Sequence, residues 1–276
     1  NYIFTNTQRG ISPSMAVITA TSDFGPKDAT LAKAKAHFIR RVKELQWVDI
    51  SHEVEPHNIQ QASFLLKRAF TSFPPGTIHV VFVGSGPQKG LTYVCVKANK
   101  QYFIAANNGI LPSLLMDAKI TDARALDIRG VDPNDVFALY STAAAHLAEG
   151  GKLELLGPVV QRIKRIKEHE PMVEEQMIRG SVVYIDHYGT CVTNITKSMF
   201  DAQLRGRKPS VETPRNRSIG RFYDRIGDVP PGKLAAVWDE HHHLCIVVGK
   251  SGGEHVKGSN ELLGMKVHDW VRMDFI

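Results

Sequence analysis

Two carboxylates stand on a turn that follows a buried strand near the start of the chain. Residues 17–21 are a β-branched run typical of a buried strand, and the Gly- and Pro-containing turn after it carries Asp23. Asp28 precedes apolar residues at helical spacing, at the position of a helix N-cap. Open α/β sheets bind ligands where a strand runs into a turn and a helix N-terminus. Asp23 and Asp28 are therefore candidate ligand-binding residues, and an Asx-turn and a helix cap are their purely structural alternatives.

The loop at residues 84–90, with the sequence GSGPQKG, also follows a buried strand. Backbone N–H groups of such a loop can hold a phosphate. The spacing GxxxxGK[ST] of a nucleoside-triphosphate loop is missing, and no helical pattern follows. A connection between strands is the structural alternative, and the sequence favours it over a triphosphate site.

Neither the histidines nor the cysteines form a pattern of metal ligands. Adjacent histidines on a strand point to alternate faces, so residues 241–243 are interpreted, with Asp239 and Glu240, as a polar hairpin tip. No HExxH motif and no Gly-x-Ser-x-Gly nucleophile elbow occurs. We expect no metal. The three cysteines lack CxxC spacing, which indicates reduced, buried thiols in a cytoplasmic protein; they are Cys95, Cys191 and Cys245.

Composition describes an ordinary globular chain of 276 residues, with 43% hydrophobic and 22% charged residues. No apolar run approaches the ~20 residues that span a bilayer, so no membrane partner is expected. The first fourteen residues lack the apolar centre of a signal peptide. Because the chain begins at Asn1 and not at Met, a leader removed upstream of it is an alternative. The net charge is +6 and the isoelectric point about 9.2. The basic residues are dispersed without a recognisable motif, so we expect no nucleic-acid partner.

The elements that must position these residues change character near residue 160. Before it, strands and amphipathic helices alternate, which predicts an α/β/α sheet domain over residues 1–165 with strand 17–21 central in the sheet. Residues 162–172 suit a linker. Short β-type runs then predict a small all-β, barrel-like domain over residues 176–276. The expected strands are 17–21, 47–50, 78–83, 93–96, 102–105, 125–128, 180–184, 191–195, 233–237, 244–248 and 266–273, and the expected helices start near 28 and cover 59–70, 110–115 and 135–147.

Several stretches, in this order, resemble the S-adenosylmethionine hydroxide adenosyltransferases, relatives of the fluorinase and chlorinase enzymes. The resemblance covers most of the chain from about residue 16 onward, and the family also combines an α/β domain with a β domain. The matching stretches are TSDFGPKD (21–28), VDISHEVEPHNIQQASFLL (48–66), FPPGTIHVVFV (73–83), AANNGIL (105–111), AAAHLAEG (143–150), YIDHYGTCVTNI (184–195) and LLGMKVHDWV (262–271).

The resemblance implies a homotrimer in which the adenosyl group lies between the N-terminal domain of one subunit and the C-terminal domain of its neighbour. S-adenosylmethionine would be the substrate, and no cofactor is implied. The ribose hydroxyls would be held by Asp23, and the methionine part near Asp28 and Thr30. The remaining implied substrate-binding residues are His57, which covers the adenosyl group, Asn107 and Asn108 of the NNG turn, and Asp186, Tyr188 and Thr190 of the C-terminal domain, where Thr190 replaces the family's Asn.

The reactive half of the family site is altered. Hydrolytic members position water with an Asp–Arg–His set, but Gly84 stands at the Asp position, the loop contains no Arg, and residues 132–135 contain no His. The remaining candidates for holding a water molecule are Ser85 and Lys89. The resemblance implies hydrolysis of S-adenosylmethionine by attack of water at C5′, giving adenosine and methionine. A non-catalytic binder of adenosine or S-adenosylmethionine, and an enzyme with a different nucleophile, are the alternatives.

Overall fold

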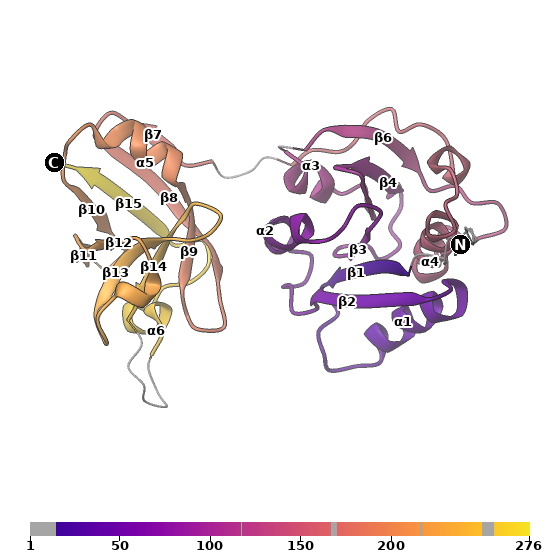
Figure 1. The fold of residues 1–276 in the computed structure, drawn as a ribbon, viewed down its shortest axis with the longest axis horizontal. Coiled ribbons are helices and arrows are strands. Elements are labelled where there is room, and N and C mark those ends of the chain that lie inside the picture. The colour runs from indigo at the N-terminus through magenta and orange to yellow at the C-terminus, as the bar shows by residue number, and fades with distance from the viewer. Residues whose placement is uncertain (1–14, 117, 167–169, 216, 250–256) are drawn as a thin grey trace, which may run out of the picture. The chain divides into compact units, whose positions relative to one another are not determined.

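The computed structural model describes residues 15–116, 118–166, 170–215, 217–249 and 257–276. The chain forms two compact units, divided between residues 167 and 168 (Figure 1). Each unit has its own hydrophobic core. The segment considered for a signal peptide, residues 1–14, and residues 167–169 of the expected linker lie outside the described residues.

The N-terminal unit is built on a mixed sheet with the strand order β2-β1-β3-β5-β4-β6. The first four of these strands are parallel, and β4 is antiparallel to both β5 and β6. Strand β1 has a neighbour on each side but is not central, because one strand is added beyond it on one side and four on the other. The strands are β1 (Ala16–Ser22), β2 (Leu45–Ser51), β3 (Ile78–Phe82), β4 (Tyr93–Ala98), β5 (Gln101–Ala106) and β6 (Ile120–Ala125).

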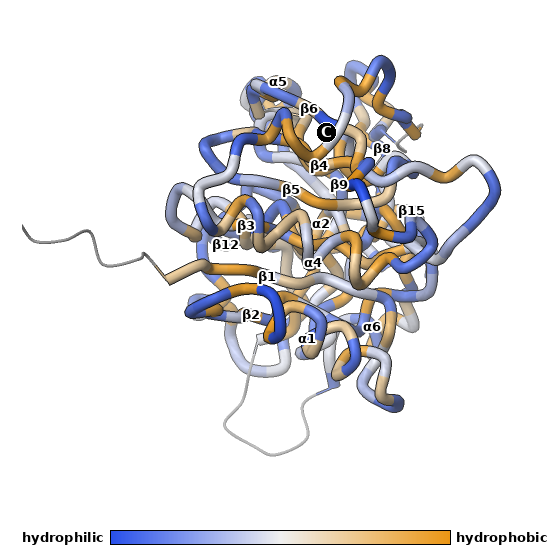
Figure 2. The backbone as a smooth tube through the Cα atoms, turned by 90° about the vertical axis from the view of Figure 1, so that its right-hand side faces the viewer, coloured by the Kyte–Doolittle hydropathy of each residue, from blue (hydrophilic) through white to orange (hydrophobic). Residues whose placement is uncertain are grey.

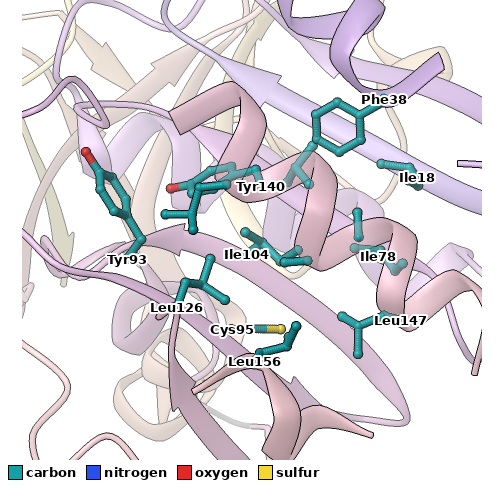
Figure 3. Packing of buried hydrophobic residues seen from close by; sticks show 14 of the residues in the cluster. Ile18, Phe38, Ile78, Tyr93, Cys95, Ile104, Leu126, Tyr140, Leu147 and Leu156 are labelled. Carbon is teal, nitrogen blue, oxygen red and sulfur yellow. The ribbon is translucent and has the colours of Figure 1, made fainter. Parts of the chain in front are cut away.

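Helices cover both faces of this sheet, as the alternating pattern predicted. Helices α1 (Thr30–Arg41) and α4 (Val136–Ala148) pack together on one face, and α2 (Ile59–Ala69) and α3 (Ile110–Leu114) on the other (Figure 1). Short 3-10 turns follow at η1 (Phe70–Ser72) and η2 (Leu153–Leu156). Figure 3 shows the core under α4, where Tyr140 and Leu147 of the helix belong to one cluster with Ile104 of β5 and Leu126. The architecture is an α/β/α layer structure, which confirms the predicted fold class.

Three predicted elements are displaced by a few residues, and one of them, the strand expected at 266–273, lies at Trp270–Phe275 in the C-terminal unit. Helix α1 starts at Thr30 with Ala29 as N-cap, because the Asp28 carboxylate accepts a hydrogen bond from the Thr30 backbone N–H (2.7 Å) in the turn just before the helix. The strand expected at 125–128 lies at Ile120–Ala125 instead. Strand β6 ends at Ala125, and the chain after it makes one backbone hydrogen bond to Tyr93 of β4 and one to Leu156.

The second hydrophobic layer of the N-terminal unit contains a buried histidine. His79 on β3 is 0% exposed, and its Nδ1 lies 2.7 Å from the Thr19 hydroxyl of β1. Its ring stacks on Phe103 and meets Phe70 and Phe73 edge-on. Burial lowers the pKa of His79 to about 4. The neutral imidazole is therefore part of this core, which is hydrophobic along β4 and β5 (Figure 2).

The C-terminal unit is a curled sheet with the strand order β11-β10-β15-β8-β9-β14-β13-β12, and β7 pairs with β8. This arrangement agrees with the predicted barrel-like β domain. The sequence did not predict helices α5 and α6, which are too short for a clear periodic pattern. The elements are β7 (Met172–Glu174), β8 (Met177–Ile185), β9 (Cys191–Thr196), α5 (Lys197–Leu204), β10 (Pro209–Glu212), β11 (Ser218–Ile219), β12 (Phe222–Tyr223), η3 (Ile226–Asp228), β13 (Leu234–Trp238), β14 (His243–Val248), α6 (Ser259–Leu263) and β15 (Trp270–Phe275).

His241 and His242 lie at the tip of the β13–β14 hairpin, as predicted, and His243 is the first residue of β14. The Asp239 carboxylate accepts hydrogen bonds from the backbone N–H groups of His241 (2.9 Å) and His243 (2.8 Å), so it organises the turn. Within the described ranges, no group of three or more His, Cys, Asp or Glu side chains is placed to hold a metal ion. Among these residues, no helix has the length and apolarity to cross a membrane.

Candidate functional site

The candidate site lies where the parallel strands β1, β3 and β5 end. Their register places Ser22 of β1 opposite Phe82 of β3, and Val81 of β3 opposite Ala105 of β5. The loops that carry Asp23, Gly84 and Asn108 therefore leave the sheet at one edge. This is the edge at which open α/β sheets bind ligands.

Asp23 fastens two of these loops. Its Oδ2 accepts a hydrogen bond from the backbone N–H of His57 (2.9 Å) and another from that of Gly84 (3.2 Å). These partners are 34 and 61 residues away in the chain. Its Oδ1 has no hydrogen-bond partner in the part of the chain that the structure describes. Asp23 thus combines a structural oxygen with an oxygen that can accept hydrogen bonds from a ligand.

His57 and Asn108 lie beside Gly84. A Cβ atom added at Gly84 would lie 3.2 Å from Asn108 Nδ2 and 3.5 Å from His57 Nδ1. The Asn108 amide is buried and donates to the Val83 carbonyl (3.0 Å), while its Oδ1 accepts from the Ile110 N–H (3.3 Å). Asn108 therefore holds the loop after β3 against the start of α3. The structure brings together three of the predicted site residues, Asp23, His57 and Asn108.

The two residues proposed to hold water differ in their surroundings. Ser85 is buried next to Gly84, and its carbonyl accepts a hydrogen bond from the Tyr93 hydroxyl (2.9 Å). Burial raises the pKa of that Tyr93 hydroxyl, which is consistent with its role as a hydrogen-bond donor. Lys89 lies in the exposed part of the same loop. Ser85 is thus fixed near Asp23, whereas no contact fixes the Lys89 ammonium there among the described residues.

Asp28 and Thr30 form a separate, exposed turn. Hydrogen bonds from the Thr30 side chain and then from its backbone N–H lower the pKa of the Asp28 carboxyl. Asp28 is therefore a stable carboxylate at neutral pH. The structure gives Asp28 and Asp23 no hydrogen-bond partner in common.

Asn107 holds the segment that follows η2. Its amide donates to the Arg162 carbonyl (3.2 Å) and accepts from the Lys164 N–H (2.8 Å). Ile166 covers the adjacent Gly109, where a Cβ would come 2.4 Å from the isoleucine Cγ2. Both ends of the Asn107 side chain are thus occupied by the protein, a role that the sequence did not predict.

The sequence also did not predict a polar network that begins at Ser22, the residue before Asp23. Ser22 Oγ lies 2.7 Å from His52 Nδ1, and His52 Nε2 lies 2.8 Å from Asp49 Oδ1. Although partial burial raises the pKa of Asp49, hydrogen bonds from Lys35, His52 and Trp47 outweigh this effect and lower that pKa to about 2. Ser22 is 0% exposed, so this Ser–His–Asp set is structural. The polar end of β2, DISH at residues 49–52, was the available signal.

The predicted residues of the C-terminal unit share one turn. Asp186 Oδ1 accepts hydrogen bonds from the backbone N–H groups of Tyr188 (2.9 Å) and Thr190 (2.8 Å). The Ser259 hydroxyl donates to the Gly189 carbonyl (2.8 Å) and anchors this turn on α6. The Tyr188 side chain is 66% exposed. Asp186 therefore builds the turn from which Tyr188 projects; a role of this turn in binding stays a prediction.

Both units match family models. Residues 18–157 match the model described as the SAM hydroxide adenosyltransferase N-terminal domain, and residues 180–272 match the model of the C-terminal domain. Together the two matches cover most of the chain and occur in the order that the model names give.

Relatives and solved structures extend the same likeness over nearly the whole chain. A protein named (R)-S-adenosyl-L-methionine hydrolase from Salinispora tropica is 24% identical over 93% of this chain and 97% of its own length. A protein of the same name from Thermus thermophilus is 25% identical over 89% of this chain and 96% of its own length. A fluorinase from Actinopolyspora mzabensis is 24% identical over 69% of this chain and 75% of its own length. The crystal structure of an uncharacterized conserved protein from Thermotoga maritima superposes with a TM-score of 0.82, at 26% identity over 94% and 99%.

Proposed function

The chain belongs to the SAM hydroxide adenosyltransferase family, and from this premise we propose that it hydrolyses S-adenosylmethionine to adenosine and methionine. The relatives named (R)-S-adenosyl-L-methionine hydrolase, which align over most of both chains, support this activity. The observation that carries the proposal is the Asp23 carboxylate, held at the strand ends with one oxygen available to a ligand.

Asp23 suits a ribose diol. The two hydroxyls of a diol are donors, and a carboxylate oxygen has lone pairs to accept them. Hydrogen bonds to a charged group contribute roughly 1.5–3 kcal/mol each. Asp28, ionised in its exposed turn with Thr30 beside it, supplies the charge that would pair with the methionine ammonium. His57 completes the proposed substrate-binding set of this unit. Asn107 and Asn108, whose amides are occupied by backbone groups, serve the proposed site by holding the loops around it.

The chemistry needs little activation of the leaving group. The sulfonium of S-adenosylmethionine leaves as a neutral thioether, so positioning a desolvated water in line with the C5′–S bond supplies much of the rate. Water attacks C5′, and the electron pair of the C5′–S bond moves to sulfur, giving methionine. Ser85 is the buried hydroxyl next to Gly84 that can hydrogen-bond this water, and Lys89 is a second, exposed candidate.

We also propose a homotrimer in the cytoplasm. The family resemblance implies that the Asp186–Thr190 turn of a neighbouring subunit completes the adenosyl site. The exposed Tyr188 side chain suits such a contact. The cysteines Cys95, Cys191 and Cys245 are free and buried, as expected in a reducing compartment. Light scattering is expected to give about three times the 30.7 kDa chain mass. A monomer at micromolar concentration would remove the C-terminal residues from the site.

The activity is tested by incubating the purified protein with S-adenosylmethionine and resolving the products by chromatography. We expect adenosine and methionine in equal amounts. Tight binding of S-adenosylmethionine without turnover would instead identify a binding protein. A 5′-halogenated adenosine, formed when halide is added, would identify another nucleophile; the fluorinase relatives are the observation that favours this second candidate.

A further inference from the structure

We propose that His57 is the catalytic base that takes the proton of the attacking water. This inference deepens the proposed hydrolysis and rests on it. It depends on three observations in the N-terminal unit: the direction of the imidazole, the conformation of its backbone, and the carboxylate to which that backbone is attached.

The imidazole faces the strand-end loops and is not engaged elsewhere. His57 Nδ1 would lie 3.5 Å from a Cβ at Gly84, so it stands over the start of the loop that carries Ser85. No side chain or carbonyl of the described residues hydrogen-bonds this imidazole. The other titratable group at this point, Asp23, has its Oδ2 committed to two backbone N–H groups, and its Oδ1 is the proposed acceptor for the ribose hydroxyls. The imidazole is thus the group here whose nitrogen lone pair is available to a water proton.

The backbone of His57 holds an uncommon conformation for a residue with a side chain. Its φ is +61°, in the left-handed region. The conformation is stabilised by the N–H bond to Asp23 Oδ2 and by the following helix, because Asn58 caps α2 through the Gln61 N–H (3.0 Å). Strained residues that the surroundings hold in place are found preferentially at functional sites.

One carboxylate sets the geometry of both the substrate and the base. Oδ1 of Asp23 is the proposed acceptor for the ribose hydroxyls, and Oδ2 binds the His57 backbone. Ribose and imidazole are therefore held by the same rigid group, which is the arrangement that favours reaction in a bound complex. General-base assistance of this kind contributes about 10²–10⁴-fold in rate.

The step balances without a co-reactant. The water oxygen forms a bond to C5′ while the C5′–S bond breaks, and its electron pair remains on sulfur, which becomes the thioether of methionine. The water proton moves to His57 Nδ1 and is later released to solvent. Adenosine keeps the new hydroxyl at C5′, so the overall change is the addition of one water and the release of one proton.

The test compares His57→Gly and His57→Asn with the parent. Both residues tolerate a left-handed backbone, so the loop is retained while the base is removed. We expect adenosine formation from S-adenosylmethionine to fall at least about 10²-fold in both variants. Because His57 also borders the proposed adenosyl site, adenosine affinity measured by calorimetry is expected to fall as well, but at least about tenfold less than the rate. Added imidazole should restore at least tenfold of the rate in His57→Gly, where it can occupy the vacated space, and should have little effect on His57→Asn. His242→Gly is the matched control, because His242 is also an exposed histidine with positive φ (+63°), on the C-terminal hairpin tip; it should keep the parent rate.

Each outcome decides the proposal. A His57→Gly variant within threefold of the parent rate overturns the role of His57 but leaves hydrolysis standing. A slow His57→Gly variant that imidazole does not rescue, whether or not adenosine affinity falls as much as the rate, shows that His57 does not act as the base and also overturns the proposal. A parent protein that forms no adenosine overturns both the proposed function and the base.

Discussion

Replacing Asp23 by Ala is expected to reduce adenosine affinity on the order of 10²-fold or more, the largest loss of binding expected from a single change in this site. The substitution removes the acceptor for two ribose hydroxyls, and each charge-assisted bond contributes roughly 1.5–3 kcal/mol. It also leaves the N–H groups of His57 and Gly84 without their common partner, so both loops lose their attachment to β1.

Asp23→Asn separates these two roles. The amide oxygen can keep the bonds to His57 and Gly84, and the amide nitrogen then faces the ribose, where a donor meets a donor. We expect the folded structure to be retained, with the thermal midpoint close to that of the parent, and adenosine affinity to fall at least about tenfold, equivalent to 1.4 kcal/mol. Calorimetry with adenosine and with S-adenosylmethionine measures both.

Asp28→Asn is the matched control for the carboxylate. Its proposed partner is the methionine ammonium, so the variant should bind adenosine like the parent and bind S-adenosylmethionine more weakly. If Asp23→Asn binds adenosine as well as the parent does, Asp23 only holds two loops by hydrogen bonds and the proposed ribose site is wrong.

The second large effect concerns stability in acid. The folded state keeps His79 neutral with a pKa of about 4, whereas an unfolded histidine titrates near 6.5. Between these values the unfolded chain binds a proton that the folded chain does not, so stability decreases as the pH falls. The contribution of His79 to the free energy of unfolding is fully present above pH 6.5 and is lost as the pH falls from 6.5 to 4. The pKa difference of 2.5 between the two states corresponds to about 3 kcal/mol.

His79→Gln should remove this part of the pH dependence. Glutamine can still hydrogen-bond the Thr19 hydroxyl but does not titrate. Urea unfolding at several pH values between 7 and 4 can be followed by the helical circular dichroism signal, to which the long helices of the N-terminal unit contribute most. We expect a smaller loss of unfolding free energy for the variant than for the parent. The exposed His242→Gln variant controls for a generic histidine effect, and equal pH slopes for His79→Gln and the parent would contradict the role of His79.

Much of the fold could be predicted from the sequence because its signals are local. The β-branched run of β3 and the apolar periodicity of α2 each lie within a dozen residues. The Asp239 hairpin tip was equally local, because its hydrogen bonds reach only two and four residues along the chain. The elements that the sequence missed, such as α5 and β11, are too short to carry a repeating pattern.

The candidate site is a different case, because side-chain roles there depend on distant partners. The sequence by itself determined that Asp23 stands at a strand end with a resemblance to an adenosyl site. Only the tertiary structure decided that one of its oxygens fastens the loops at His57 and Gly84, since those N–H groups come from 34 and 61 residues away. The same holds for Asn107, whose amide is occupied by a segment 55 and 57 residues further on. Sequence patterns report which residues can form hydrogen bonds, but the packing of the sheet decides which partners reach them and which atoms remain for a ligand.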